Sequence, residues 1–258
     1  MSVAHESAGP APIGLVTGTS SGIGAEVAQD LLRRGWEVLG LARRPAPFHH
    51  ARYRHVRLDL ADTARLEGTL EGPLGDDLGL DGRPRVGLVN GAATLEPVGP
   101  TGALPAAGLV RAFAVNAVAP IWLLGFLLRR VRGSRLRVVD VSSGAARHAY
   151  AGWSAYCATK AALRMAGEVI GAEAREFAPG TALPTDLSVV SYEPGVVDTE
   201  MQQAVRGVVA QAFPQVKRFL DLHAAGQLHP PLRPAAEIAD LLESDGLPVF
   251  SERRLGGG

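Results

Sequence analysis

The sequence predicts a single α/β domain built on a doubly wound parallel sheet. Six short apolar runs bounded by turn residues recur along the chain, at 13–17, 36–42, 54–58, 85–90, 136–141 and 186–192. Stretches with the apolar spacing of a helix lie between them, such as 25–35 and 120–133. Continuous β-rich runs that alternate with helices are typical of a parallel sheet covered on both faces. The βαβαβ order from the first residues onward favours the doubly wound arrangement.

The composition is that of an ordinary globular domain. Of the 258 residues, 47% are hydrophobic and 20% are charged. The formal net charge is zero and the isoelectric point is about 7.1, so no global field attracts nucleic acid or anionic lipid. We therefore expect a small-molecule partner, with no nucleic acid and no membrane. Cys157 is the only cysteine, which excludes an internal disulfide and is compatible with a reducing cytosol.

Residues 1–12 lack the basic segment and apolar run of a signal peptide. We interpret them as a disordered leader to a single domain over 13–258. No stretch approaches the roughly 18 uninterrupted apolar residues that span a membrane, so we expect a cytoplasmic protein. The histidines His148, His223 and His229 are isolated and lack ligand spacing, so no metal site is predicted.

A glycine-rich loop, TGTSSGIG, directly follows the first apolar run and opens the first predicted helix. Glycine permits positive φ and lets the backbone approach a phosphate closely. The N–H groups at the start of the helix then face the anion. The pattern predicts a nucleotide-binding loop formed by Gly18, Ser20, Ser21, Gly22, Ile23 and Gly24. The alternative is a βα turn with no ligand, because many such turns contain glycine.

A second motif combines Tyr156, Lys160 and Ser143. Tyr156 and Lys160 are four residues apart in a helical segment, SAYCATKAAL, so they lie on one face a turn apart. A free tyrosine has a pKa near about 10, and a neighbouring ammonium is expected to lower it. Ser143 ends the fifth apolar run, at the edge where parallel sheets bind ligands. Taken alone, the Tyr and Lys pair favours a solvated surface, because this spacing occurs often by chance.

Together these motifs resemble the short-chain dehydrogenase/reductase family. The resemblance rests on the Gly-x-x-x-Gly-x-Gly loop, the Ser143 and Tyr156 spacing, the Tyr-x-x-x-Lys motif and Asn116 in FAVNAVAP, and it covers Ile13 to about Phe250. It implies a Rossmann-type fold and a catalytic tetrad of Asn116, Ser143, Tyr156 and Lys160. In the family, Ser polarises the substrate oxygen, Tyr transfers a proton, and Lys and Asn relay protons through a water. The alternative role for Asn116 is a hydrogen bond to backbone only.

The resemblance also implies how a nicotinamide cofactor is held. Arg43 follows the second strand, where NAD enzymes of the family carry an acid. A guanidinium suits a 2′-phosphate, so NADP(H) is favoured and NAD(H) remains possible; alternatively, Arg43 is a plain surface residue. Further cofactor contacts implied by the family are Asp59, Asn90, Ala92, Tyr156, Lys160, Pro194, Gly195, Val197 and Thr199. The segment Asn90-Gly91-Ala92-Ala93 departs from the family's Asn-Asn-Ala-Gly, so the hydrogen bonds of the second Asn are in question.

Segments 144–163, 192–202 and 216–242 look like the sepiapterin reductase and benzil reductase branch. That branch implies a helical substrate lid around 198–232. Sepiapterin reductases carry an acid near the C-terminus that grips the pterin, and Phe250 takes its place here. A pterin anchor is therefore expected to be missing. The candidate pocket residues are Tyr150, Trp153, Met201 and Gln202, which could equally be core or interface residues.

The prediction is thus an NADP(H)-dependent reduction of a carbonyl, in a bulky aromatic or 1,2-diketone substrate, to an alcohol. One alternative is a pterin carbonyl reductase of the sepiapterin type. Another is a nucleotide-sensing protein without turnover, which would not need the whole tetrad. An epimerase or dehydratase of the extended fold would need a longer C-terminal region. The resemblance also implies a homodimer or homotetramer through the helices that contain Asn116 and Tyr156.

Overall fold

The computed structural model describes residues 9–177 and 183–257. Seven parallel strands form one sheet in the order β3-β2-β1-β4-β5-β6-β7. The strands are β1 (Ile13–Thr17), β2 (Glu37–Ala42), β3 (Tyr53–Arg57), β4 (Arg85–Asn90), β5 (Arg135–Val141), β6 (Leu187–Glu193) and β7 (Phe250–Arg254). The sheet order confirms the Rossmann-type doubly wound fold. The leader predicted over 1–12 falls mostly outside the described residues.

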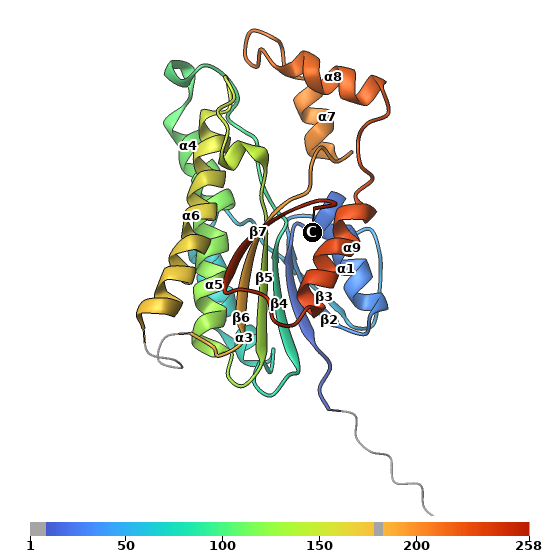
Figure 1. Cartoon of the computed structure of the whole chain (residues 1–258), viewed down its shortest axis with the longest axis vertical. Helices are drawn as coiled ribbons and strands as arrows, with labels where there is room; N and C mark the ends of the chain where they lie inside the picture. The colour runs from blue at the N-terminus through green and yellow to red at the C-terminus, as the bar shows by residue number, and fades with distance from the viewer. Residues whose placement is uncertain (1–8, 178–182, 258) are drawn as a thin grey trace, which may run out of the picture.

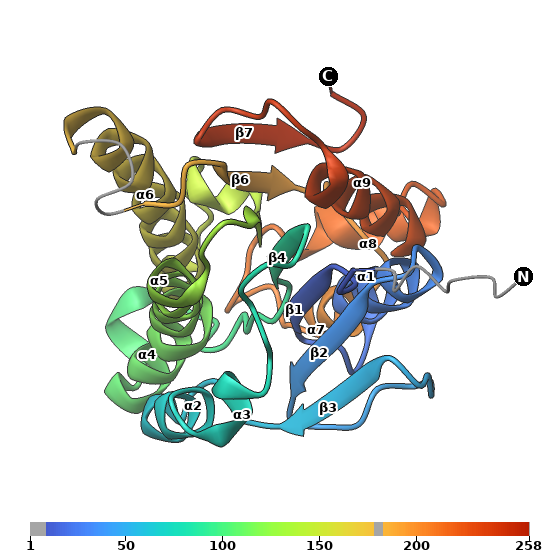
Figure 2. The ribbon, with the colours of Figure 1, turned by 90° about the horizontal axis from the view of Figure 1, so that it is seen from below.

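Helices cover both faces of the sheet (Figures 1 and 2). They are α1 (Gly22–Arg33), α2 (Thr63–Leu70), α3 (Pro73–Asp76), α4 (Ala106–Phe113), α5 (Ala119–Arg130), α6 (Ser154–Glu176), α7 (Glu200–Arg206), α8 (Val216–Ala224) and α9 (Leu232–Glu243). Helices α2, α4, α5 and α6 lie on one side, and α1 and α9 on the other. Two apolar cores result, one on each face of the sheet. Strand β1 is buried along its whole length, which explains its continuous apolar sequence.

The sequence analysis did not predict β7. This strand, FSERR, is mostly charged and pairs only with β6, so it is an edge strand that is half exposed. Its pairing with β6 in register, Val189 with Phe250 and Glu193 with Arg254, makes it a strand. An edge strand needs no continuous apolar run, because one of its sides is not covered by a neighbour.

A continuous helical segment runs from Ala106 to Arg130 and includes α4, a π-helical turn at Ala114–Val118, and α5. It is long and apolar enough to cross a membrane by length and composition, with a mean hydropathy of 1.7 in its best window. However, 56% of that window is buried inside the protein. Leu123, Phe126 and Leu127 belong to the core against the sheet. Its apolar character is thus accounted for in large part by packing on the sheet.

The carboxyl ends of the strands meet at one edge of the sheet, and helices α7 and α8 lie beyond this edge (Figure 1). The glycine loop follows β1, the Asn90 segment follows β4, Ser143 lies just beyond β5, and Pro194 follows β6. Strand order reverses between β1 and β4, and ligands of open α/β sheets bind in the crevice at such a point.

Candidate active site

A cavity of about 970 Å³ lies at this edge of the sheet and extends from the glycine loop to Tyr156. Nearly all of the residues that the sequence predicts for cofactor, catalysis and substrate line it: Gly18, Ser20, Ser21, Gly22, Ile23, Gly24, Arg43, Asp59, Ala92, Ser143, Tyr150, Trp153, Tyr156, Lys160, Pro194, Gly195, Val197, Thr199, Met201 and Gln202. Asn90 and Asn116 are buried behind the cavity wall.

The glycine loop fits a dinucleotide. Gly18 and Gly22 have φ values of 78° and 58°, a region that other residues rarely adopt. A Cβ on Gly24 would lie 2.5 Å from the Gly18 carbonyl oxygen, so only glycine lets α1 start this close to β1. Ser21, the N-cap of α1, makes no side-chain capping bond. The first N–H groups of α1 therefore remain available to a phosphate at the cavity wall.

Charged residues that follow β2 and β3 line the cavity beside the glycine loop. Arg43 and Asp59 both line the cavity, and Asp59 pairs with Arg111 at 2.9 Å. Burial raises the pKa of Asp59, but hydrogen bonds from the Ala61 N–H and from Arg111 outweigh it, so the pKa lies below its ordinary value. The sequence analysis did not predict Arg111, because its contact with Asp59 joins elements far apart in the chain.

Arg44 follows Arg43 and pairs across the cavity with Glu200 at the start of α7, at 2.6 Å. Arg43 forms no ion pair within the described part of the chain, 9–177 and 183–257. Its guanidinium is therefore available to a ligand, whereas Arg44 is bonded to a carboxylate. This difference agrees with Arg43 as the residue that would contact a ribose phosphate.

Tyr156 and Ser143 meet at the other end of the cavity. Helix α6 carries Tyr156, and the turn after β5 carries Ser143, whose Oγ accepts a hydrogen bond from Ala145 N at 3.2 Å. Burial raises the pKa of Tyr156 to about 12, and the nearby Ser143 side chain opposes this shift. Ser142 and Ser143 both line the cavity, but Ser143 is the serine that acts on Tyr156.

The prediction that Lys160 lowers the pKa of Tyr156 is wrong for this structure. The Lys160 Nζ lies 5.8 Å from the centre of the tyrosine ring and donates a hydrogen bond of 2.6 Å to the Val141 carbonyl oxygen. Helical spacing placed the two side chains on one face, as expected, but the sequence could not show that a backbone carbonyl would bind the ammonium. The Tyr156 hydroxyl is therefore fully protonated at neutral pH.

Lys160 and Asp140 form a buried electrostatic pair. Burial lowers the pKa of Lys160 to about 8, opposed by the charge of Asp140. Burial likewise raises the pKa of Asp140 to about 6, opposed by a hydrogen bond from Asn90 and by the charge of Lys160. The Asn90 Nδ2 donates to the Asp140 Oδ1 at 2.7 Å. Asn90 thus acts on Lys160 indirectly, through Asp140.

Asn116 lies in the π-helical turn, and both polar atoms of its side chain are hydrogen-bonded. Its Oδ1 accepts from Thr94 N at 2.8 Å, while Nδ2 donates to the Thr94 carbonyl oxygen at 2.8 Å and to Thr159 Oγ1 at 3.1 Å. These bonds tie the loop after β4 to helix α6, next to Lys160. The alternative anticipated from the sequence, a bond to backbone, is therefore present.

The loop after β4 lacks the second Asn of the family pattern, and Thr17 compensates for it. The Thr17 Oγ1 accepts a hydrogen bond from Ala92 N at 3.0 Å. A Cβ on Gly91 would lie 2.9 Å from the Thr17 carbonyl oxygen, so glycine allows this loop to lie against β1. The hydrogen bond from Ala92 to Thr17 of β1 thus takes the place of bonds that the second Asn would make.

The substrate end of the cavity is aromatic. Trp153 stacks on Phe213 with ring centroids 4.3 Å apart and meets Tyr156 edge-on at 5.5 Å. Phe219 from α8 packs against the same tryptophan. Trp153 is both a core residue of this cluster and part of the cavity wall. The two alternatives given for it by the sequence, a pocket residue and a core residue, are therefore both correct. The sequence analysis did not predict Phe213 and Phe219. They are far from Trp153 in the chain, and no local pattern indicates that they pack against it.

Phe250 does not lie at the cavity, which corrects the argument that it replaces a pterin-binding acid. It starts β7, and its ring packs against Gly167 and Gly171 of α6. This position is at the opposite end of the strand from the cavity. The charged residues that reach the cavity wall here are Glu193 and Arg254, at the ends of β6 and β7. Neither was predicted from the sequence.

The profile of the short chain dehydrogenase family matches residues 13–208. The chain belongs to this family. A benzil reductase ((S)-benzoin forming) of Bacillus subtilis is 32% identical over 231 residues, covering 89% of this chain and 92% of that protein. A sepiapterin reductase of Bos taurus is 29% identical over 251 residues, covering 90% and 89%.

A solved short-chain dehydrogenase/reductase from Burkholderia vietnamiensis has 36% sequence identity and a TM-score of 0.65, and the match covers 79% of this chain and 94% of that one. These similarities support the benzil and sepiapterin reductase-like branch that the sequence resembles. As a member of this family, the protein is an oxidoreductase that uses a nicotinamide nucleotide and acts on a small molecule.

Proposed function

We propose that the chain reduces the carbonyl group of a bulky aromatic ketone or 1,2-diketone to an alcohol with NADP(H), using Tyr156 as acid and base. The observation that carries this proposal is that Ser143, Tyr156 and Lys160 line one end of a cavity that has the glycine loop at its other end. The cavity joins a nucleotide loop to a proton donor.

In this proposal the bound cofactor supplies a hydride to the carbonyl carbon. The Ser143 hydroxyl donates a hydrogen bond to the carbonyl oxygen and stabilises the charge that develops on it. Tyr156, protonated because of its raised pKa, gives its proton to the same oxygen. Lys160 returns a proton to Tyr156 through an intervening hydroxyl or water, becomes a neutral amine, and then takes up a proton from solvent; its Nζ can donate to the Val141 carbonyl oxygen in either state. We assign to Asn116 the role of holding a water that links Lys160 to solvent, together with its bonds to Thr94.

The cofactor preference for NADP(H) over NAD(H) rests on Arg43, which lines the cavity and forms no ion pair within the described residues, 9–177 and 183–257. No acid faces the same position from the end of β2, because the strand ends in Ala42 and Arg43. A guanidinium can bond a 2′-phosphate with two parallel hydrogen bonds. Asp59, held by Arg111, remains the proposed adenine contact.

The aromatic wall of Trp153, Tyr150 and Phe219 supports a bulky aromatic substrate through stacking and dispersion. Helices α7 and α8 supply part of this wall with Met201, Gln202 and Phe219, so we propose that 198–232 acts as the substrate lid. We also propose a cytoplasmic homodimer or homotetramer.

Pterin carbonyl reduction is a second candidate, because Glu193 places a carboxylate at the cavity wall. That carboxylate is already bonded by Arg147 and Arg254, which leaves it less able to bind a pterin, so aryl diketones remain the first candidate. A nucleotide sensor without turnover would not need Ser143 and Tyr156 together at the cavity wall.

The test is a substrate panel of benzil, other aryl diketones, sepiapterin and simple aldehydes, with NADPH and NADH oxidation followed by absorbance. We expect kcat/KM for benzil to exceed that for sepiapterin by about tenfold, roughly 1.4 kcal/mol of transition-state binding. Faster reduction of sepiapterin would favour the second candidate. Cofactor binding without turnover of any carbonyl would favour the sensor.

A further inference from the structure

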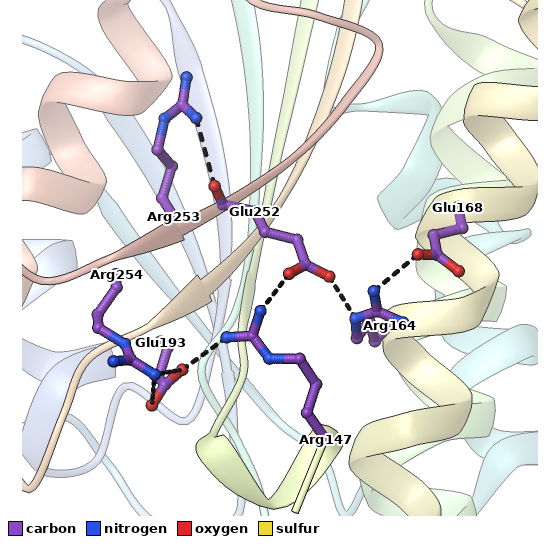
Figure 3. Close-up of polar contacts among 7 residues, drawn as sticks. All are labelled: Arg147, Arg164, Glu168, Glu193, Glu252, Arg253 and Arg254. Carbon is purple, nitrogen blue, oxygen red and sulfur yellow. Dashed lines mark hydrogen bonds and ion pairs between the residues drawn. The ribbon is translucent and has the colours of Figure 1, made fainter. Parts of the chain in front are cut away.

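Charged side chains of alternating sign form a chain of ion pairs from Arg254 and Glu193, which line the cavity, to helix α6 (Figure 3). We call this set the Arg147 network; in order, its members are Arg254, Glu193, Arg147, Glu252, Arg164 and Glu168. Arg147 is its centre, because it bonds two carboxylates from two different strands.

The contacts of Arg147 are short and directional. Its Nη2 donates to Glu193 Oε2 at 3.0 Å, and its Nη1 donates to Glu252 Oε2 at 2.5 Å. Glu193 also accepts from Arg254 Nη2, at 3.0 and 3.2 Å. With only 15% of its side chain exposed, Glu193 is largely removed from water. Each carboxylate in this part of the network thus has a guanidinium on both sides.

The far end of the network reaches helix α6. Arg164 Nε donates to the second oxygen of Glu252, and Arg164 Nη2 pairs with Glu168 Oε1 at 2.8 Å. Arg164 lies one helical turn beyond Lys160, on the helix that also carries Tyr156. Arg147 is therefore linked through one carboxylate to the catalytic helix.

The near end joins the two loops that flank the reaction centre. Arg147 ends the turn Gly144–Ala146, whose N-cap is Ser143. Glu193 directly precedes Pro194 and Gly195, the segment proposed to lie against the nicotinamide. The network thus connects the serine turn, the nicotinamide loop and the tyrosine helix, which are the three parts that hold the reacting groups.

Exposed ion pairs contribute little to global stability, about 0–1 kcal/mol each. Their effect on geometry is larger, since a displacement of about 1 Å at a reacting centre can reduce turnover about a hundredfold. Removing Arg147 would also leave Glu193 and Glu252 as neighbouring carboxylates without their shared cation. Their repulsion would act between the ends of β6 and β7, and the serine turn would lose the ion pairs that hold it to both strands.

We propose that Arg147 is a positioning residue of the carbonyl reduction, which holds the Ser143 turn in register with the nicotinamide loop and with helix α6. This inference rests on the proposed function, because it concerns the geometry of the same reaction. Arg147 does not itself touch the reacting atoms. It acts through Glu193 and Glu252.

The test compares Arg147→Met, which keeps the length of the side chain but not its charge, with Arg147→Lys and with a control, Arg34→Met. Arg34 pairs with Asp30, Asp240 and Glu243 where α1 meets α9, outside the cavity lining. In Arg147→Met we expect kcat, measured with the carbonyl of the panel that the wild-type protein reduces best, to fall about tenfold or more. The Kd for NADPH should stay within twofold. Lysine, a single point charge, should recover part of the loss. Arg34→Met should lower the thermal midpoint without lowering kcat.

Ionic strength gives an independent readout on the unmutated protein. At about 1 M salt the Debye length is about 3 Å, so the ion pairs of Arg147, whose side chain is 40% exposed, weaken. With saturating NADPH and substrate, wild-type kcat should fall toward that of Arg147→Met, whose own kcat should change little.

The inference is overturned if Arg147→Met retains wild-type kcat, if cofactor affinity falls in step with kcat, or if salt lowers the kcat of wild type and variant equally. If Arg147→Met does not fold, the same two measurements, the change in kcat and its response to salt, are applied to Arg147→Lys. If the wild-type protein reduces no carbonyl, the proposed function itself is overturned. This outcome differs from failure of the Arg147 inference, which requires an active wild-type protein and an equally active variant.

Discussion

Burial sets the protonation of the titratable side chains around the catalytic end of the cavity. Tyr156, with a pKa of about 12, remains a proton donor over the whole physiological range. Lys160 loses its charge near pH 8, and Asp140 loses its charge below about pH 6. Both are charged only between these values. A protein that must return protons to Tyr156 is therefore expected to be most active in this window.

Tyr156→Phe should reduce kcat by about 10² to 10⁴, the usual contribution of a positioned general acid. NADPH affinity should stay within a few-fold, because the lost hydroxyl serves the transition state. Tyr192→Phe is a matched control: this buried tyrosine of β6 donates its hydroxyl to Glu237 at 2.8 Å, outside the cavity lining. Steady-state kinetics and a fluorescence titration measure both effects. Substantial turnover by Tyr156→Phe would refute its role.

Asp140→Asn should move the alkaline limb of the pH profile to lower pH. The carboxylate of Asp140 raises the pKa of Lys160, against its burial. Without that charge Lys160 deprotonates earlier as pH rises, while the asparagine oxygen can still accept the bond from Asn90. The profile of kcat for reduction, measured from pH 6 to about 10, tests this. An unchanged alkaline limb would mean that Lys160 does not limit the proton supply.

Arg43→Ala should weaken NADPH binding by about 1.5 to 3 kcal/mol, the value of a lost charge-assisted hydrogen bond. NADH binding should change little, because NADH has no 2′-phosphate. Arg44→Ala is the comparison, since Arg44 is bonded to Glu200. Titration of both cofactors against both variants gives the ratio. Equal losses for NADPH and NADH would make Arg43 merely structural.

At the scale of elements, close approach between β1 and α1 depends on a few glycines. Gly24 has no room for a side chain, because a Cβ would lie 2.5 Å from the carbonyl oxygen of Gly18. By contrast, Gly68 in α2 is exposed and meets nothing within 4 Å. The same substitution should therefore act in opposite directions at these two positions.

Gly24→Ala should shift the glycine loop and weaken NADPH binding by about tenfold or more, roughly 1.4 kcal/mol. Gly68→Ala should leave cofactor affinity unchanged and raise stability by up to about 1 kcal/mol, since alanine favours a helix over glycine. Chemical denaturation and NADPH titration of the two variants measure both quantities. A tight-binding Gly24→Ala protein would show that the loop can relax.

Short-range patterns predicted most of the elements. The first six strands lie within one residue of the predicted runs. Five of them are buried along nearly their whole length and are therefore mostly apolar. The edge strands β3 and β7 are under no such constraint; the sequence still indicated β3, but it missed the mostly charged β7. It also treated the helix of Asn116 as regular, whereas Ala114–Val118 is a π-helical turn. That turn depends on packing against α6, which no local pattern encodes.

At the scale of the whole molecule, α4, α5 and α6 lie together on one side of the sheet (Figure 2). Exposed apolar side chains on these helices and on the π-helical turn are Val110, Phe113, Val118, Ile121, Met165 and Val169, and Val110 is 70% exposed. Apolar side chains gathered on one side of a molecule mark an interaction surface. This is the side on which the sequence resemblance places the subunit contact.

We expect the protein to be a dimer or tetramer in light scattering after gel filtration, and Ile121→Lys or Met165→Lys to shift it toward smaller species. Leu232→Lys is the control, because Leu232 is similarly exposed, at 52%, but lies on α9 at the other side of the sheet. A wild type that is monomeric at micromolar concentration would contradict the prediction. Dissociation by the control would place the contact elsewhere.

By itself, the sequence determined the fold class, the glycine loop, and the placing of Tyr156 and Lys160 on one helical face. These depend on residues close together in the chain, whose geometry follows from helix and strand periods. Only the tertiary structure decided that Lys160 bonds the Val141 carbonyl rather than Tyr156, and that Phe250 lies away from the cavity. It also brought Glu193, Arg147 and Arg254 together. Such contacts depend on strand register and on packing between distant segments, and these are set only when the whole chain folds.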